Sequence, residues 1–192
     1  MASSSKGKKQ DEVPKWLREA RAKWEYTGKV RPPFAKVPQA GQRSVWDFPR
    51  PPALERESRE IVVKHSGSTL ATTTSALAVL ETASPPTYYI PPEDVNRKLL
   101  VKVPKQASLC EWKGNAEYWA LKTESAYPIA WSYANPFPPF EKLTDYLAFY
   151  PQKLECYLNQ ERVIPQPGAF YAGWITHDLS GPFKGEPGSG HW

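Results

Sequence analysis

The amino-acid sequence predicts a mainly β fold: a compact two-sheet antiparallel β domain with one N-terminal helix and ordered extensions rich in proline and glycine. The chain has 192 residues, of which 21 are proline and 11 are glycine. These residues interrupt the backbone too often for long helices. Over residues 60–164, apolar and polar residues alternate with the period of two that is typical of strands. The length favours a single hydrophobic core.

Composition divides the chain into four segments. We expect a disordered basic tail at residues 1–10, a helix and a proline-rich strap at 11–59, the core β domain at 60–164 and a C-terminal wrap at 165–192. Residues 1–60 hold 14 Lys and Arg and 8 Asp and Glu, whereas residues 61–192 hold 11 and 12. Nucleic acid binding needs positive charge on the folded face, so the core is not expected to bind nucleic acid.

The N-terminal segment predicts one short helix. Pro14 stands at a favoured first helical position, and Gly28 is a typical helix end. Trp16 and Trp24 lie on the apolar side of this helix. A helix of this length is marginal alone, so it is expected to pack on its own domain, with a binding partner as the alternative.

The strap (residues 29–59) and the C-terminal wrap (residues 165–192) are expected to lie extended and ordered on the domain. Proline in the strap and glycine with proline in the wrap exclude long regular elements. Aromatic side chains are expected to hold both segments in place, namely Trp46, Phe48, Phe170, Tyr171 and Trp174. The wrap would then cover a sheet edge or a pocket mouth. A proline-motif ligand is the alternative interpretation of the strap.

The core is predicted to be a series of short strands. They are expected at residues 61–63, 69–74, 76–81, 99–103, 115–122, 127–133, 146–150, 154–158 and 162–164. Pro104 is expected to end the fourth of these strands, and Ser84-Pro85-Pro86 to form a stiff corner. Residues 138–145 could hold one or two helical turns.

Three ionisable residues are the candidates for catalysis. Cys110 precedes Lys113 by three residues, so a turn could place an ammonium beside a thiol and favour the nucleophilic thiolate. Glu81 ends a predicted strand beside a rigid loop, where functional polar groups are often mounted. Turned inward, Glu81 would meet Lys113 or a tyrosine hydroxyl. The structural alternatives are a buried thiol, a lysine that caps a turn and a Glu–Lys ion pair.

Aromatic side chains are concentrated around these three residues. They could wall a pocket for a flat or sugar-like ligand, with hydroxyl and indole N–H groups to orient it. At least half of them are expected to be core residues. The set comprises Tyr88, Tyr89, Trp112, Tyr118, Trp119, Trp131 and Tyr133, and Gly114 permits a tight turn beside them.

Other classes of function lack their motifs. His65, His177 and His191 are scattered and no Cys-x-x-Cys occurs, so no metal site and no cofactor are predicted. No apolar run approaches the roughly 20 residues of a membrane span. Two distant cysteines, Cys110 and Cys156, favour free thiols in a reducing compartment. We therefore expect a monomer or weak homo-oligomer in the cytoplasm, with the plastid as the alternative in a photosynthetic source.

Several blocks of the core resemble the domain of unknown function 427 family. The blocks are Val79–Thr82, Tyr88–Pro91, Cys110–Gly114, Tyr118-Trp119, Ala130–Tyr133 and Ala148–Tyr150. The strap and the wrap resemble those of longer cyanobacterial and plant-type members. The resemblance implies a mainly antiparallel β domain, of the tent-like two-sheet sort, and points to Glu81, Tyr88, Tyr89, Cys110, Trp112, Lys113, Gly114 and Tyr133.

The resemblance also brings chemical labels that the residues do not support. Relatives of this architecture often hold zinc with cysteine pairs, which are absent here. A nucleotidyltransferase-like label requires paired carboxylates for magnesium, and only Glu93 and Asp94 are adjacent, on a predicted turn.

We therefore expect an aromatic-lined pocket that binds a small ligand or a partner, with Glu81 and Lys113 as its polar groups. One alternative is a small-molecule enzyme with Cys110 or Lys113 as nucleophile and Glu81 as acid or base. The other is a protein interaction module formed by the N-terminal helix and the strap. The sequence names neither substrate nor partner.

Overall fold

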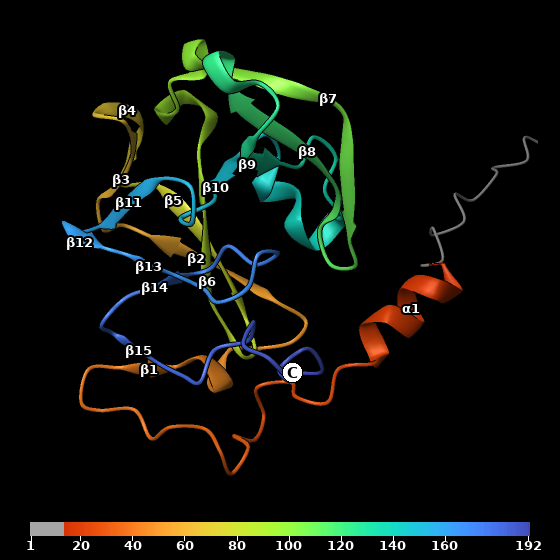
Figure 1. Cartoon of the computed structure of the whole chain (residues 1–192). Coiled ribbons are helices and arrows are strands. Elements are labelled where there is room, and N and C mark those ends of the chain that lie inside the picture. Colours follow the sequence, from red (N-terminus) through yellow and green to blue (C-terminus); the bar gives the residue numbers. More distant parts are fainter. Residues whose placement is uncertain (1–13) are drawn as a thin grey trace, which may run out of the picture.

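Two antiparallel sheets form the body of the protein, which confirms the predicted fold class (Figure 1). The computed structural model describes residues 14–192, so the tail predicted at residues 1–10 lies outside the described residues. The strands are β1 (Arg43–Ser44), β2 (Ala53–Glu57), β3 (Ile61–His65), β4 (Ser68–Thr73), β5 (Ala76–Glu81), β6 (Ser84–Ile90), β7 (Leu100–Cys110), β8 (Gly114–Leu121), β9 (Pro128–Ser132), β10 (Leu147–Phe149), β11 (Glu155–Leu158), β12 (Glu161–Arg162), β13 (Ile164–Pro165), β14 (Trp174–Ile175) and β15 (Leu179–Ser180).

The larger sheet has seven strands in the order β2-β5-β6-β10-β9-β8-β7, and the smaller has four in the order β12-β11-β3-β4. Every pairing within these two sheets is antiparallel. The 3-10 turn Pro138–Leu143 lies where helical turns were predicted. The strand β2, at the end of the strap, is an edge of the larger sheet, so the strap enters the body of the fold.

The two faces of the seven-stranded sheet contribute to different cores. Consecutive strand residues point to opposite faces. On β6, Tyr88 packs in a core that also contains Ile61 and Leu158 of the smaller sheet, whereas Tyr89 packs in a second core. On β9, Trp131 belongs to that second core. The smaller sheet therefore covers one face, where Trp46 of the strap and Trp174 of the wrap also pack, and the second core lies on the other face.

The N-terminal helix α1 (Lys15–Ala22) packs on its own domain, as expected, but it ends six residues before Gly28. Arg21 Nε donates a hydrogen bond to the Glu111 carbonyl oxygen at 2.7 Å. Gly28 has φ +78°, and a Cβ there would lie 2.1 Å from the Phe48 carbonyl oxygen. Gly28 is needed for this close approach of the chain to the strap, and not as a helix end.

The strap and the wrap lie together along one side of the domain (Figure 1). Their strands β1 and β15 pair in parallel. Trp46, which is fully buried, packs edge-on against Tyr26 and Phe34, and its ring centroid lies 5.2 Å from that of Trp192. Phe48 is also buried. These rings hold the strap on the domain as the sequence predicts, because large aromatic side chains bury much apolar area.

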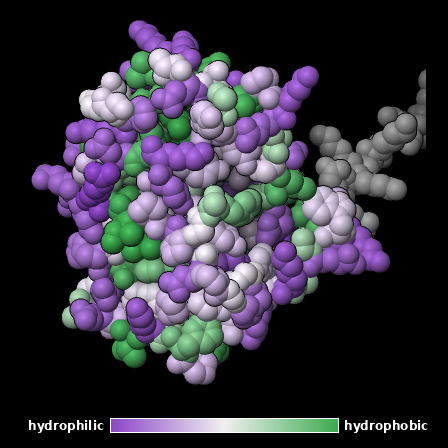
Figure 2. Space-filling model, viewed as in Figure 1, coloured by the Kyte–Doolittle hydropathy of each residue, from purple (hydrophilic) through white to green (hydrophobic). Residues whose placement is uncertain are grey.

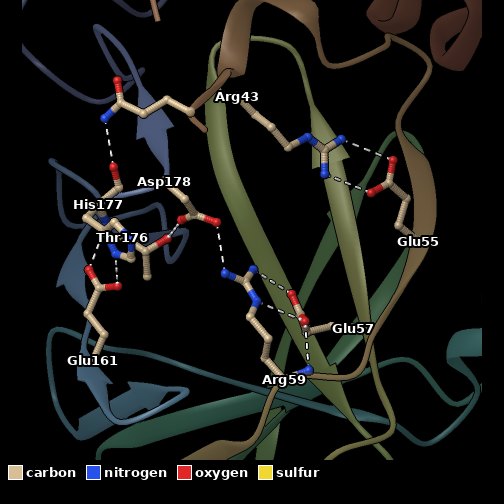
Figure 3. Close-up of polar contacts among 9 residues, drawn as sticks. Arg43, Glu55, Glu57, Arg59, Glu161, Thr176, His177 and Asp178 are labelled. Atoms are coloured by element: carbon tan, nitrogen blue, oxygen red, sulfur yellow. Dashed lines mark hydrogen bonds and ion pairs between the residues drawn. The ribbon is translucent and has the colours of Figure 1, made fainter. Parts of the chain in front are cut away.

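Charged side chains fasten the wrap to the rest of the chain (Figure 3). Arg59 Nη2 donates to a Glu57 carboxylate oxygen at 2.7 Å, and Arg59 Nη1 donates to Asp178 Oδ2 at 2.8 Å. The ring of His177 contacts Glu161 at 2.5 Å. Because these pairs are partly or largely exposed to water, each contributes little to stability. They fix the path of residues 176–178 more than they stabilise the core.

Two predictions for the core are wrong: where the strand that contains Pro104 ends, and which residues form the corner after β5. Strand β7 continues through Pro104 to Cys110, because it is the edge strand of the sheet and its register against β8 shifts between Lys102 and Ala107. An edge bulge tolerates a residue without an N–H group. The corner after β5 is formed by Thr82 and Ala83, and the two prolines that follow lie inside β6. Ala83 takes the positive φ of 68° that the turn requires.

The surface seen in Figure 2 is largely hydrophilic, with hydrophobic residues scattered among charged ones. Within residues 14–192, no helix has both the length and the apolar character to cross a membrane.

We predict that Glu161→Gln lowers the pKa of His177. The hydrogen bond to the Glu161 carboxylate raises the pKa of His177 above 6.5. A raised folded-state pKa means that this contact stabilises the fold below about pH 6.5 and that the contribution is lost as pH rises through the folded-state pKa. An NMR titration of the His177 ring in both proteins measures the shift. Glu186→Gln, elsewhere in the wrap, should leave the titration unchanged, and an unchanged titration in Glu161→Gln would contradict the assignment.

Candidate functional site

A cavity of about 480 Å³ lies on the face of the seven-stranded sheet that the smaller sheet does not cover. Strands β5, β6, β8 and β9 form its floor through Val79, Thr87, Tyr89, Ala116, Tyr118 and Trp131. The turn between β7 and β8 contributes Cys110, Glu111, Trp112 and Lys113. The remaining wall comes from the extensions, through Lys23, Trp24, Gln166, Phe170, Tyr171, Ala172, Lys184 and Gly190. The wrap therefore borders a pocket, one of the two positions that the sequence predicts for it.

Lys113 and Cys110 meet at one side of this cavity. The turn that joins them ends at Gly114, whose φ of +98° favours glycine. Lys113 is 8% exposed, and both side chains line the cavity. Burial opposes the charge of Lys113, but Cys110, Tyr89 and Glu81 around it raise the pKa of the lysine above its ordinary value. Lys113 is therefore a cation at neutral pH.

Phenol and indole groups form a hydrogen-bonded lining beside Lys113. Trp131 Nε1 donates to the Tyr89 hydroxyl at 3.2 Å, and Tyr89 also hydrogen-bonds Tyr133. Burial raises the pKa of both tyrosines, so both hydroxyls stay protonated. Within residues 14–192, the indole N–H of Trp112 is the one buried side-chain polar atom without a hydrogen-bond partner. A buried donor without a partner is rare in folded proteins, and this one belongs to a residue that lines the cavity.

Glu81 also lines the cavity, but its partner is an arginine that the sequence analysis did not select. Arg50 Nε donates to Glu81 Oε1 at 3.1 Å, and the arginine side chain is 2% exposed. Arg50 also donates to the carbonyl oxygens of Tyr26 and Thr82, each at 2.9 Å. Its guanidinium lies 4.6 Å from the ring centroid of Trp24. Glu81 thus faces the cavity while it is held in place by Arg50, and its link to Lys113 is electrostatic.

Most of the predicted site residues come together around this cavity. Glu81, Tyr89, Cys110, Trp112, Lys113, Trp131 and Tyr133 all line it. Tyr88 does not, because it follows the strand alternation to the opposite face, where its ring packs 5.2 Å from Trp174. Gly114 shapes the turn without lining the cavity. Trp119 lies on the Tyr88 side and donates to Ser132 at 2.9 Å.

The sequence analysis missed the contributions of the two extensions. Trp24 Nε1 donates to a Glu111 carboxylate oxygen at 3.1 Å, which fixes the chain after α1 at the cavity. Lys184 is 3% exposed, lines the cavity and lies 3.7 Å from the Trp24 ring centroid. The only feature of the sequence that marks Arg50 and Lys184 as site residues is that each is a basic residue within a segment rich in aromatic, proline and glycine residues. Such a signal does not reveal which distant residues will meet.

The protein is a mainly β domain with a cavity on its larger sheet. The sheet forms the floor of the cavity, and the two extensions form part of its walls. The family described as a domain of unknown function, DUF427 (NTP_transf_9), matches residues 53–160, and the chain belongs to this family. A search of curated proteins finds no match to the chain. The matched residues include the sheet and the turn at residues 110–114, whereas Arg50 and Lys184 lie outside the match.

The family name suggests nucleotidyl transfer, which would need a magnesium site. Glu93 and Asp94 lie on the 3-10 turn Pro92–Asp94 and do not line the cavity. In the described part of the chain, no group of three or more His, Cys, Asp and Glu side chains could hold a metal ion. The residues present do not fit magnesium-dependent phosphoryl chemistry.

We predict that Arg50→Ala destabilises the protein by about 3 kcal/mol. Removal of a buried guanidinium leaves the Glu81 carboxylate and two carbonyl oxygens without their donors, and breaking a buried pair costs roughly 3–5 kcal/mol. Chemical denaturation followed by tryptophan fluorescence measures the change. Arg31→Ala is the matched control, because Arg31 makes two hydrogen bonds to Asp47 at an exposed site, and its loss should destabilise the protein much less than the loss of Arg50. Equal losses for the two variants would contradict a central role for Arg50.

Proposed function

We propose that this protein binds a small anionic ligand with a planar part in the cavity, between Lys113 and the aromatic lining. The single observation that carries the proposal is the convergence of one buried cation and several aromatic side chains on a cavity of about 480 Å³. That volume lies within the range of small-molecule sites, about 300–1,000 Å³.

Charge supports an anion as the ligand. Lys23, Lys113 and Lys184 line the cavity against Glu81 and Glu111, and Arg50 already pairs with Glu81. No Asp or Glu carboxylate lies within 4.0 Å of the Lys113 amine in residues 14–192, whereas the Lys184 amine donates to the Trp192 main-chain oxygen. A buried ammonium without a carboxylate partner favours a ligand that brings a negative group.

The aromatic lining supports a planar ligand. Trp112, Trp131, Tyr89 and Tyr133 present ring surfaces, the tyrosines carry neutral hydroxyls, and Trp112 has an unpaired N–H. A flat apolar body would pack against these rings while its polar edge meets the hydroxyl and N–H groups.

A second candidate is covalent chemistry at Cys110, with Lys113 as its activating cation and Glu81 as acid or base. The observation that favours it is that Cys110 and Lys113 line the same cavity and that Cys110 is among the groups that raise the pKa of Lys113. The interaction-module alternative has less support. Trp24 and Trp46 pack within the chain, although Trp16 is 51% exposed.

We predict that benzoate binds the protein and that Lys113→Met weakens its binding about 10-fold or more. A hydrogen bond to a charged group contributes roughly 1.5–3 kcal/mol, and about 1.4 kcal/mol corresponds to a tenfold change in affinity. Quenching of tryptophan fluorescence provides the titration, because Trp24, Trp112 and Trp131 line the cavity.

Lys23→Met is the control for the Lys113 variant, because Lys23 lines the same cavity but is exposed. It should change the affinity much less. Mass spectrometry of small molecules that co-purify with the protein widens the search to other planar anions. If no planar anion binds, or if both variants bind equally well, the proposed function is wrong.

We predict that iodoacetamide alkylates Cys110 at least about tenfold faster than Cys156 at pH 7.5. Cys110 is partly exposed in the cavity, whereas Cys156 is buried and its burial raises the pKa of its thiol. Peptide mapping measures both rates in one sample. Lys113→Met should slow the reaction at Cys110 and leave Cys156 unaffected. An inert Cys110 would remove the second candidate.

A further inference from the structure

A pair of hydroxyl groups lies in the wall of the cavity, on the strands β7 and β8. Ser108 Oγ and Tyr118 Oη are 2.7 Å apart and share one hydrogen bond, in which either atom can be the donor. The strands pair with Ser108 opposite Ala116, so Tyr118, two residues farther along β8, is the diagonal neighbour of Ser108. Both residues are half-buried and line the cavity. The cavity therefore has a polar pair that the proposed function does not use.

This pair can both donate a hydrogen bond to a ligand and accept one from it. Each hydroxyl group has one proton and two lone pairs. The bond between Ser108 and Tyr118 uses one proton and one lone pair, so one proton and several lone pairs remain, whichever atom donates. Tyr150 is a third hydroxyl in the same wall, and burial raises the pKa of Tyr150, so its hydroxyl also stays protonated. An open chain of hydroxyl groups always keeps one proton that the chain itself does not use.

The hydroxyl pair and Lys113 are separated along β8. Lys113 directly precedes Gly114, the first residue of the strand, whereas Tyr118 lies four residues after Gly114. Four residues of a strand span about 13 Å, at about 3.3 Å per residue. Ala116 lies between them, lines the cavity and has a small side chain. The sheet therefore leaves room for a flat ring between a cation at the turn and a neutral polar pair farther along the strand.

The surroundings of the pair are aromatic, which strengthens a hydrogen bond made there. Tyr118 is paired with Trp131 of β9, and the Trp131 and Tyr150 ring centroids are 4.7 Å apart. All three rings line the cavity. Hydrogen bonds are stronger where water is partly excluded, and a site that bonds a ligand hydroxyl discriminates against the analogue that lacks it. The pair is therefore placed to decide which planar ligands bind.

We propose that Ser108 and Tyr118 select planar anions that carry a hydroxyl group on the ring, opposite the anionic group. The ligand class is therefore the hydroxylated aromatic acids. The inference rests on the proposed function, since Lys113 holds the anionic group of the same ligand. The ring lies over Ala116, and the ligand hydroxyl donates to one atom of the pair and accepts from the other.

A set of matched planar acids, titrated into the full chain, tests this inference. Benzoate has no ring hydroxyl, para-hydroxybenzoate has one opposite the carboxylate, and ortho-hydroxybenzoate has one beside the carboxylate. Isothermal titration calorimetry at neutral pH gives the affinity of each acid. The hydrogen bonds to the pair should make para-hydroxybenzoate bind at least about fivefold tighter than benzoate. The ortho isomer should gain much less, because its hydroxyl cannot reach the pair while its carboxylate is at Lys113.

Tyr118→Phe removes one hydroxyl of the pair and keeps the ring. The ratio of the para-hydroxybenzoate affinity to the benzoate affinity should then fall to about one. The ratio separates selection from packing, because a loss of packing weakens both acids alike. Ser108→Ala removes the other hydroxyl and should also lower the ratio. Tyr127→Phe is the matched control and should leave the ratio unchanged, because Tyr127 is 69% exposed and does not line the cavity.

The results distinguish this inference from the proposed function. Equal affinities of the unmodified protein for the three acids, or a preference that persists in Tyr118→Phe, would overturn the inference even if benzoate binds in a Lys113-dependent manner. Binding of phenol, a neutral probe, that depends on Tyr118 without binding of any acid would support the hydroxyl pair and contradict the planar-anion proposal. If neither phenol nor any of the acids binds, both are wrong. Because the preference of the unmodified protein is measured first, the test does not depend on the folding of any variant.

Discussion

The buried guanidinium of Arg50 is the interaction on which the arrangement of the cavity depends. It lies in the strap, yet it bonds to Glu81 at the end of β5, to the Thr82 carbonyl in the following turn and to the Tyr26 carbonyl after α1. Three segments distant in sequence therefore meet at one planar group. A guanidinium suits this position because its five N–H donors fan out in a fixed plane. Trp24, which stacks beside it, thereby becomes part of the cavity wall.

The strand alternation of the seven-stranded sheet separates structural from site-forming aromatic residues. Tyr88 and Tyr89 are neighbours in sequence, but one packs against Trp174 between the sheets and the other faces the cavity. The same rule places Trp119 and Trp131 on opposite faces. One sheet can therefore combine a closed apolar core with an open polar-aromatic surface, because each face collects every second side chain.

The fold could be predicted because its signals are local, whereas the site could be predicted only in part. Strands β3, β5 and β8 follow from alternation within short windows, and the turn at residues 110–114 follows from its glycine. The prediction that Pro104 ends its strand is wrong because a bulge in an edge strand tolerates proline. Whether a strand lies at the edge of the sheet cannot be read from a local sequence pattern. Arg50 and Lys184 were not predicted as site residues for a related reason. Their burial depends on partners 24 to 160 residues away.

The two buried lysines of the cavity show how one fold can give the same side chain opposite properties. Lys113 comes from the core turn and is surrounded by a thiol, a phenol and, farther off, a carboxylate, which favour its charged form. Lys184 comes from the wrap, where burial first and then the charge of Arg50 lower its pKa to about 8. Burial penalises both ammonium groups, so the neighbours decide the sign of each pKa shift. The cavity therefore holds one buried lysine from the core side and one from the wrap side, each set among different neighbours.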